Sequence, residues 1–249
     1  MTETSRFASR HPAAALVYAA DVDGTEVVVD GPDGHHLQRV RRIGVGEAVI
    51  AADGRGRWVP GTVTRAASGT VHVAPDGEAR TEPRLAPHLA VAFAPAKGDH
   101  AADVVHALVE LGVDRIIPVE TERSVVRWHG ERAERAVDRL RRVAREAAMV
   151  ARRAWLPVVE EPVALATLAA HPAPVLGDVH GDQAAELAPP RGGEWLVITG
   201  PEGGFAPAEI DRFAGAARVA VGPHVLRART APVALAAAVA GCRSPQDAP

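Results

Sequence analysis

Two short loops near the C-terminal end of the chain have the composition of a ligand-binding site. The first is Gly-Pro-Glu-Gly-Gly at 200–204, and the second runs from Gly222 to Arg229. Glycine and proline let the backbone turn sharply and leave its N–H and C=O groups open to a ligand. Each loop follows an apolar, strand-like run and precedes a helix-like segment. In open parallel sheets, ligands bind at such loops, beyond the carboxyl ends of the strands.

Other kinds of site are less well supported by the residues. The loop at 200–204 has no Lys-Ser or Lys-Thr after it and lacks the dinucleotide spacing, so it is not a common phosphate loop. Asp178 and His180 resemble the opening motif of metal-dependent phosphoesterases, but the further ligands of a two-metal site are missing and a turn is expected. His35 and His36 are adjacent, so in a strand they would point to opposite faces and would not share a metal. We therefore predict no metal site.

The composition is that of an ordinary globular protein. Hydrophobic residues make up 47% and charged residues 24% of the 249 residues, which excludes an intrinsically disordered chain. Cys242 is the single cysteine, so an internal disulfide is excluded and a reducing compartment is indicated. No apolar run reaches the length of a membrane span, and we interpret the stretch from Ala13 to Ala20 as an early strand. We therefore expect a cytoplasmic protein.

The hydrophobic pattern changes near residue 82 and predicts two domains. Residues 1–82 contain short alternating runs separated by turn signals such as Asp-Gly, which predict a small β-barrel or sandwich. These runs are 26–29, 48–51, 61–64 and 70–73. Residues 83–249 alternate between strand and helix patterns, which predicts a mostly parallel sheet covered by helices. The expected strands are 88–93, 115–119, 173–177, 195–199 and 218–221, and the expected helices are 99–111, 131–151, 163–169, 206–214 and 230–241.

The predicted helix at 131–151 has an arginine-rich face. Its apolar residues recur at steps of three and four, which defines a buried stripe. Arg132, Arg135, Arg139 and Arg142 follow the same steps on another face. One interpretation is a solvated face whose arginines pair with acidic neighbours. The other is a surface that contacts nucleic-acid phosphates, and the residues alone leave both open.

Four motifs, in order along the chain, resemble those of the RsmE family of SPOUT methyltransferases, which methylate uridine in small-subunit ribosomal RNA. The first is His-His-Leu-Gln-Arg-Val-Arg-Arg at 35–42. The second has three parts, which are Lys-Gly-Asp at 97–99, Glu-Leu-Gly-Val-Asp-Arg-Ile-Ile-Pro at 110–118 and Thr-Glu-Arg-Ser-Val-Val at 121–126. The last two are Gly-Pro-Glu-Gly-Gly-Phe at 200–205 and Val-Leu-Arg-Ala-Arg-Thr-Ala at 225–231. The resemblance covers nearly the whole chain.

The resemblance implies a fold and a reaction. The fold is a trefoil-knotted, mostly parallel α/β catalytic domain that follows a small PUA-like, RNA-binding β-barrel and forms a homodimer. Periodicity alone does not predict a knot, because protein chains are rarely threaded. The implied reaction is methyl transfer from S-adenosylmethionine to N3 of a uridine in 16S ribosomal RNA of the small ribosomal subunit.

The resemblance also assigns roles to residues. Arg227 is the expected catalytic residue, because a guanidinium beside the cofactor stabilises the anion that forms when uracil N3 loses its proton. Glu202 either orders the glycine loop or takes up a proton. The expected cofactor contacts are Leu176, Gly177, Thr199, Gly200, Pro201, Glu202, Gly203, Gly204, Val221, Gly222, Val225, Leu226, Thr230 and Ala231. The expected RNA contacts are Arg39, Arg41, Arg42, Arg123, Arg135, Arg139, Arg142 and Arg153.

Two positions depart from the family pattern. Arg229 stands where the family usually has Glu, and Val150-Ala151 replace an amide and a hydroxyl residue. These departures keep two alternatives open. One is a SPOUT methyltransferase that acts on a different RNA site, and the other is a non-catalytic, ribosome-associated RNA-binding homologue.

Overall fold

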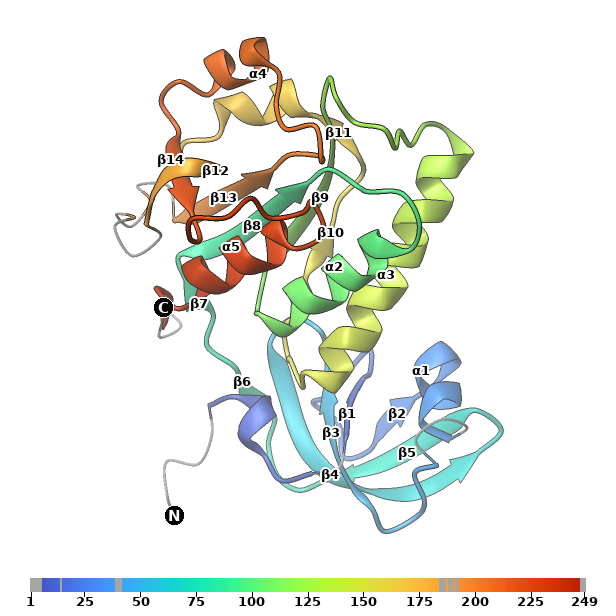
Figure 1. Cartoon of the computed structure of the whole chain (residues 1–249). Helices are drawn as coiled ribbons and strands as arrows, with labels where there is room; N and C mark the ends of the chain where they lie inside the picture. Colours follow the sequence, from blue (N-terminus) through green and yellow to red (C-terminus); the bar gives the residue numbers. More distant parts are fainter. Residues whose placement is uncertain are drawn as a thin grey trace. The chain divides into compact units, whose positions relative to one another are not determined.

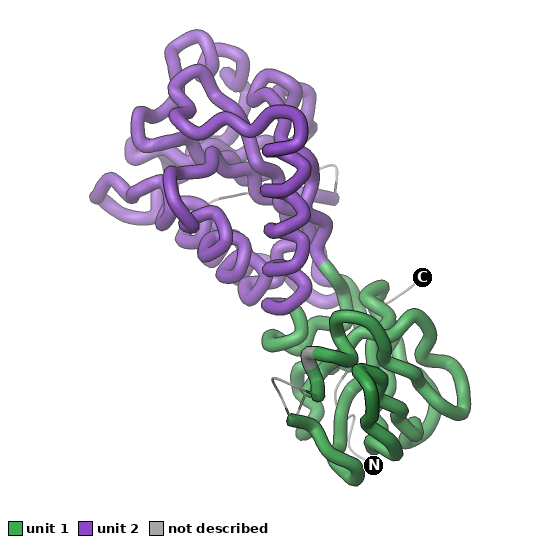
Figure 2. The backbone as a smooth tube through the Cα atoms, turned by 90° about the vertical axis from the view of Figure 1, so that its right-hand side faces the viewer, with its two compact units in different colours: residues 1–84, 148–156, 247–249 green, residues 85–147, 157–246 purple. Residues whose placement is uncertain are grey.

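The computed structural model describes residues 6–13, 15–38, 42–183, 187, 190 and 193–246, which form the two compact units in Figure 2. Unit 1 comprises the residues up to Arg84 together with 148–156, and unit 2 comprises 85–147 and 157–246. The sequence predicted a domain boundary between residues 82 and 83, which places residues 148–156 in the second domain. This segment joins unit 1 because Gly56 N–H donates to the carbonyl of Ala154 (3.1 Å) and the Trp155 indole donates to the carbonyl of Glu82 (2.9 Å).

Unit 1 contains a six-stranded sheet in the order β1-β3-β4-β5-β2, with β6 beside β4. The strands are β1 (Ala15–Tyr18), β2 (Val27–Val29), β3 (Ala48–Ala52), β4 (Arg57–Ala67), β5 (Thr70–Pro75) and β6 (Arg80–Thr81), preceded by the 3₁₀ turn η1 (Ala8–Arg10). β1 and β3 run parallel, and the other pairs are antiparallel. The predicted runs at 26–29, 48–51, 61–64 and 70–73 all contribute to these strands.

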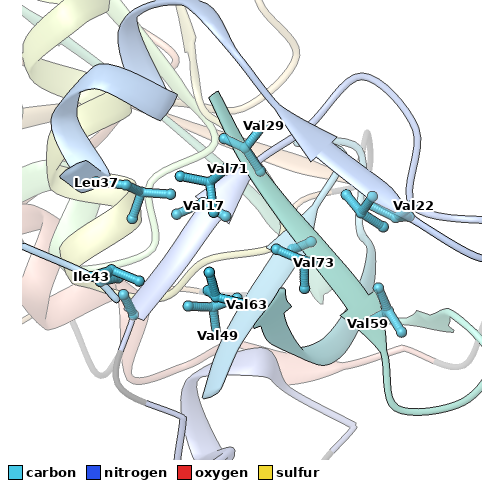
Figure 3. Packing of buried hydrophobic residues seen from close by; sticks show 13 residues of the cluster. Val17, Val22, Val29, Leu37, Ile43, Val49, Val59, Val63, Val71 and Val73 are labelled. Atoms are coloured by element: carbon cyan, nitrogen blue, oxygen red, sulfur yellow. The ribbon is translucent and has the colours of Figure 1, made fainter. Parts of the chain in front are cut away.

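Valine dominates the interior of unit 1. Figure 3 shows Val17, Val49, Val63, Val71 and Val73 gathered with other apolar side chains in this buried cluster. Valine suits these positions because its β-branched side chain is stiff and packs well on a pleated surface.

Residues 31–36 form a short helix, α1 (Gly31–His36), whereas His35 and His36 were expected to lie in a strand. That expectation was wrong. Pro32 lies in the first turn, where a missing backbone N–H removes no helical hydrogen bond.

Unit 2 contains a seven-stranded sheet in which every strand pair is parallel. Its order is β10-β9-β8-β13-β12-β14, and β11 also pairs with β9. The strands are β8 (His88–Phe93), β9 (Arg115–Glu120), β10 (Val158–Val159), β11 (Val163–Ala164), β12 (Pro174–Gln183), β13 (Glu194–Thr199) and β14 (Ala217–Ala220). A separate antiparallel pair joins β7 (Leu85–Ala86) to β15 (Ser244–Pro245). The predicted mostly parallel sheet is confirmed.

Helices cover both faces of this sheet, as Figure 1 shows for α5 and α4. The helices are α2 (His100–Glu110), α3 (Glu131–Val150), α4 (Pro207–Arg212) and α5 (Ala231–Ala240), and all four lie where helices were expected. α5 packs against α2 and against β8, β12 and β13. On the other face, Phe213 and Leu165 pack against strand residues such as Ile117 and Ile198. None of the helices in the described part of the chain is both long and apolar enough to cross a membrane.

The helix expected at 163–169 is a strand followed by a 3₁₀ turn. β11 pairs in parallel with the end of β9, with Val163 opposite Val119, and η3 (Leu165–Ala170) follows. The β-branched Val163 favours strand pairing, and Pro172 comes too soon for a longer helix to form.

Candidate active site

Two loops and part of a strand meet at one edge of the parallel sheet in unit 2. Strands β13, β12 and β14 are neighbours in that order and run parallel, so residues 176–179 of β12 lie beside the loops that follow β13 and β14. These segments and the first turns of α5 enclose a cavity of about 280 Å³. The two glycine-containing loops at 200–204 and 222–229 therefore belong to one site, and the residues after Gly177 complete it.

Most of the expected cofactor residues line this cavity. They are Leu176, Gly177, Thr199, Gly200, Pro201, Glu202, Gly204, Val221, Gly222, Val225, Leu226 and Ala231. Gly203 and Thr230, from the same prediction, are not among the lining residues. Gly203 instead faces the Arg123 side chain, and the backbone N–H of Thr230 donates to the Arg227 carbonyl (2.8 Å) at the start of α5.

The prediction omitted several residues that line the cavity. They are Asp178, Val179, Phe205, Ile210, Arg218, Val219, Ala220, His224, Ala228 and Leu235. One signal was available for Asp178, because it directly follows a strand end that was already assigned to the site. Arg218 gave no comparable signal, since it reaches the cavity only through the pairing of β14 with β12.

The glycines of the site are required by close packing and by backbone conformation. A Cβ atom at Gly177 would come within 2.6 Å of Leu235 Cδ1, so glycine lets α5 pack closely against β12. Gly204 has φ +66° and Gly222 has φ +129°, conformations that residues with a side chain rarely adopt. These positions keep the loops folded around the cavity.

The segment that follows β9 forms hydrogen bonds with the glycine loop and with the first turn of α4. The guanidinium of Arg123 donates to the Gly203 carbonyl (2.8 Å). The carboxylate of Glu209 accepts hydrogen bonds from the backbone N–H of Glu122 (2.8 Å) and from that of Ala206 (2.8 Å). Arg123 was expected to contact RNA, and the structure gives its guanidinium this loop contact.

Arg227 and Glu202, the expected catalytic residues, both have exposed side chains at the site. Glu202 lines the cavity, whereas Arg227 lies between the lining residues Leu226 and Ala228. The backbone of Arg227 is held because its carbonyl accepts hydrogen bonds from the N–H groups of Thr230 (2.8 Å) and Ala231 (2.9 Å). The structure therefore presents the Arg227 side chain to solvent at the edge of the cavity.

The expected RNA-contacting arginines lie in different surroundings. Arg39 and Arg41 fall outside the described residues, and Arg42 is exposed with φ 53°. On α3, Arg135 pairs with Glu131 (3.1 Å) and Arg139 with Asp99 (2.7 Å), whereas Arg142 is exposed. The hydrogen bond from Arg139 lowers the pKa of Asp99. Arg153 is half-buried, and its carbonyl accepts a hydrogen bond from the Tyr18 hydroxyl (2.7 Å).

Comparison with known proteins identifies the family. The RNA methyltransferase domain family matches residues 83–240, and the RNA methyltransferase PUA domain family matches residues 29–76. The chain is 32% identical over 236 residues to the ribosomal RNA small subunit methyltransferase E of Mycobacterium tuberculosis, covering 90% of each chain. The protein belongs to the ribosomal RNA small subunit methyltransferase E (RsmE) family. The corresponding protein of Bacillus subtilis is 25% identical over 219 residues, covering 82% of this chain and 86% of the relative.

Two solved structures of similar proteins share the fold. The RsmE protein of Neisseria gonorrhoeae, solved bound to S-adenosylmethionine, is 25% identical and superposes with a TM-score of 0.78 over 90% of this chain and 96% of that one. A methyltransferase of Legionella pneumophila, solved with the same cofactor, superposes with a TM-score of 0.80 over 91% of this chain and 97% of that one, at 24% identity. The resemblance to the RsmE family and the expected fold of a PUA-like domain with a parallel α/β domain are confirmed.

Among the described residues, no group of three or more His, Cys, Asp or Glu side chains is arranged to hold a metal ion. Asp178, part of the supposed phosphoesterase motif, instead contacts Arg218 in the wall of the cavity.

Proposed function

We propose that the protein is an S-adenosylmethionine-dependent methyltransferase that methylates N3 of a uridine in 16S ribosomal RNA. One observation carries the proposal. In a chain that matches the RsmE family over both domains, residues 176–179 of β12 and the loops after β13 and β14 line one cavity. A non-catalytic RNA-binding homologue has no need for such a cavity.

The residues of the cavity fit the methyl donor. Leu176, Leu226 and Leu235 offer apolar surface for a flat adenine ring. The loops at 200–204 and 222–226 contribute backbone polar groups. The donor supplies a methyl group on a sulfonium, which a nucleophilic nitrogen accepts. The protein's part is to hold the donor and to align the target base with that methyl group.

The position of Arg227 suits the target atom. N3 lies on the Watson–Crick edge of uracil, so the base must be unpaired or turned out of its stack before it enters the site. N3 must also lose a proton, and a guanidinium near the resulting anion stabilises it. Arg227 has this role in the proposal because its exposed side chain stands between two cavity-lining residues. Glu202 orders the glycine loop or accepts the proton.

The proposal includes how RNA reaches the site. Unit 1 belongs to a PUA family of RNA methyltransferases and binds the RNA backbone. The arginines at 39, 41, 42, 123, 135, 139, 142 and 153 add phosphate contacts in the proposal. The chain works as a homodimer through unit 2, whose last elements form a trefoil knot, as the family resemblance implies.

Mapping of modified nucleosides tests this function. Small ribosomal subunits and naked 16S RNA from cells that lack the gene are incubated with the purified protein and S-adenosylmethionine, and the RNA is digested and analysed by mass spectrometry. We expect N3-methyluridine at one position, absent without protein. Methylation of another base or RNA would favour a different substrate, as Arg229 and Val150 allow. A folded protein that neither methylates RNA nor binds the donor in calorimetry would contradict the proposal.

A further inference from the structure

Asp178 and Arg218 form an ion pair in the wall of the cavity. A guanidinium nitrogen of Arg218 contacts Oδ2 of Asp178, and both residues line the cavity. Arg218 lies on β14 opposite Leu176 of β12. Asp178 follows Gly177, at the point where the register of β12 against β14 is interrupted. Two neighbouring strands thus bring a carboxylate and a guanidinium together at the edge of the site.

The interruption in β12 positions Asp178. Gly177 and Asp182 both lie opposite Val219, so the residues between them leave the strand pairing as a small loop. Gly181 lets this loop lie on β14, because a Cβ atom there would come within 2.4 Å of the Arg218 carbonyl. Oδ1 of Asp178 accepts a hydrogen bond from the backbone N–H of His180 (3.0 Å). The carboxylate is therefore held in place from two sides.

Both charged groups keep the capacity to bind a further partner. The Asp178 side chain is 15% exposed and the Arg218 side chain is 51% exposed. A carboxylate has about four lone-pair sites and a guanidinium has about five N–H donors. Oδ2 of Asp178 is buried against Arg218, so the remaining acceptor site is on Oδ1, beside the hydrogen bond from His180, and Arg218 keeps donors of its own. A ligand with both charges can therefore bind without separating the pair.

The rest of the cavity wall contrasts with this pair. The other lining side chains are mainly apolar, as at Leu176, Phe205 and Leu235, and the remaining titratable ones are Glu202 and His224. Adenosine is uncharged and suits the apolar wall. The amino-acid end of the donor carries an ammonium and a carboxylate, and opposite charges held side by side match such a zwitterion.

We propose that Asp178 and Arg218 bind the amino-acid end of the methyl donor, with Asp178 accepting hydrogen bonds from its ammonium group and Arg218 donating to its carboxylate. This inference rests on the proposed function and adds two binding residues to it. The alternative role for Asp178 is to accept hydrogen bonds from the ribose hydroxyls, as acidic residues do in dinucleotide sites. The third role is purely structural, in which the ion pair only stabilises the packing of β12 beside β14.

Two probes that differ only at the amino-acid end separate these roles. S-adenosylhomocysteine and 5′-methylthioadenosine share adenosine and a thioether, and only the first carries the ammonium and the carboxylate. We would titrate both by calorimetry, up to millimolar concentration, into the full-length protein and into Asp178→Asn and Arg218→Gln. Arg212→Gln is the matched control, because Arg212 is exposed on α4 and does not line the cavity. Thermal unfolding of each variant reports on its fold.

We expect each cavity variant to bind S-adenosylhomocysteine about tenfold or more weakly than the wild type, because a charge-assisted hydrogen bond is lost. Binding of 5′-methylthioadenosine should change by no more than about twofold, and the control should match the wild type. Equal weakening of both probes would overturn the inference, since the pair would then act on the shared adenosine or only through the fold. Unchanged binding of S-adenosylhomocysteine would also overturn it. If the folded wild type bound neither probe, the proposed function would fall as well.

Discussion

The guanidinium of Arg123 donates a 2.8 Å hydrogen bond to the carbonyl oxygen of Gly203. This contact ties the segment after β9 to the glycine loop that lines the cavity. The expected RNA contact of Arg123 stays a prediction, and the structure adds to it this contact with the glycine loop.

We expect Arg123→Ala to weaken S-adenosylhomocysteine binding by about fivefold, because an exposed charged hydrogen bond contributes about 1 kcal/mol to holding the loop. The unfolding temperature should stay close to that of the wild type, since the Arg123 side chain is exposed. Calorimetry measures the first quantity and thermal unfolding the second, with Arg212→Ala as the control. If Arg123→Ala weakened RNA binding and left the probe affinity unchanged, the hydrogen bond to Gly203 would have no part in holding the probe.

Arg227→Ala should abolish methyl transfer and leave the affinity for S-adenosylmethionine within about threefold of the wild type. In the proposed function, Arg227 stabilises the anion at uracil N3, and this interaction matters most in the transition state. Single-turnover methylation and calorimetry measure the two quantities. Wild-type turnover in this variant would remove Arg227 from the mechanism.

Reversing Arg135, Arg139 and Arg142 to Glu should weaken RNA binding and reduce its salt dependence. Each lost phosphate contact to single-stranded RNA lowers the slope of log K against log salt by about 0.7. The structure makes Arg142 the sharpest single test, because Arg135 and Arg139 already pair with Glu131 and Asp99. Fluorescence anisotropy at several salt concentrations measures the slope, with Arg212→Glu as control. An unaltered slope would support the interpretation in which this face of α3 is solvated and does not contact RNA.

Glu82 predicts a pH effect on the stability of unit 1. Burial raises the pKa of its carboxyl group above the usual value, although the backbone N–H of Ala8 donates to it (2.9 Å). The unfolded chain therefore releases the proton at lower pH than the folded one, so this residue's contribution to stability is full below about pH 4.5 and is lost as the pH rises through the folded pKa.

Glu82→Gln should remove this pH dependence. Relative to the wild type, the variant should become more stable as the pH rises from about 4 to about 7. Chemical denaturation of both proteins across this range, followed by tryptophan fluorescence, measures the difference. A difference that moved in the opposite direction would mean that the folded state favours the ionised carboxylate.

Gly177→Ala should reduce both stability and donor binding. The added Cβ would lie 2.6 Å from Leu235 Cδ1, and such overpacking costs about 1–3 kcal/mol of the free energy of unfolding. Combining it with Leu235→Ala should recover part of the loss, because the clashing methyl group is gone. Denaturation of the two single variants and the double variant gives the coupling. Strict additivity would show that the clash is relieved by other movements.

Much of the architecture could be predicted from local patterns. The alternating runs of unit 1, the strands of the parallel sheet and the helices α2, α3, α4 and α5 follow from periodicity and turn residues, which act over short distances. Predictions were wrong where a short segment could adopt a second type of secondary structure. Residues 163–169 begin as β11 because Val163 pairs with Val119. His35 and His36 lie in α1 because Pro32 favours the first turn of a helix.

The sequence by itself determined where the loops that line the cavity form, because glycine and proline at 200–204 and 222–223 are required locally by the turns. Only the tertiary structure decided what surrounds them. The order β13-β12-β14 places Arg218 beside Asp178, and residues 148–156 return to unit 1 through hydrogen bonds to Gly54 and Gly56. Such pairings join residues far apart in the chain, and they depend on which strands and loops pack together, which no local pattern of residues specifies.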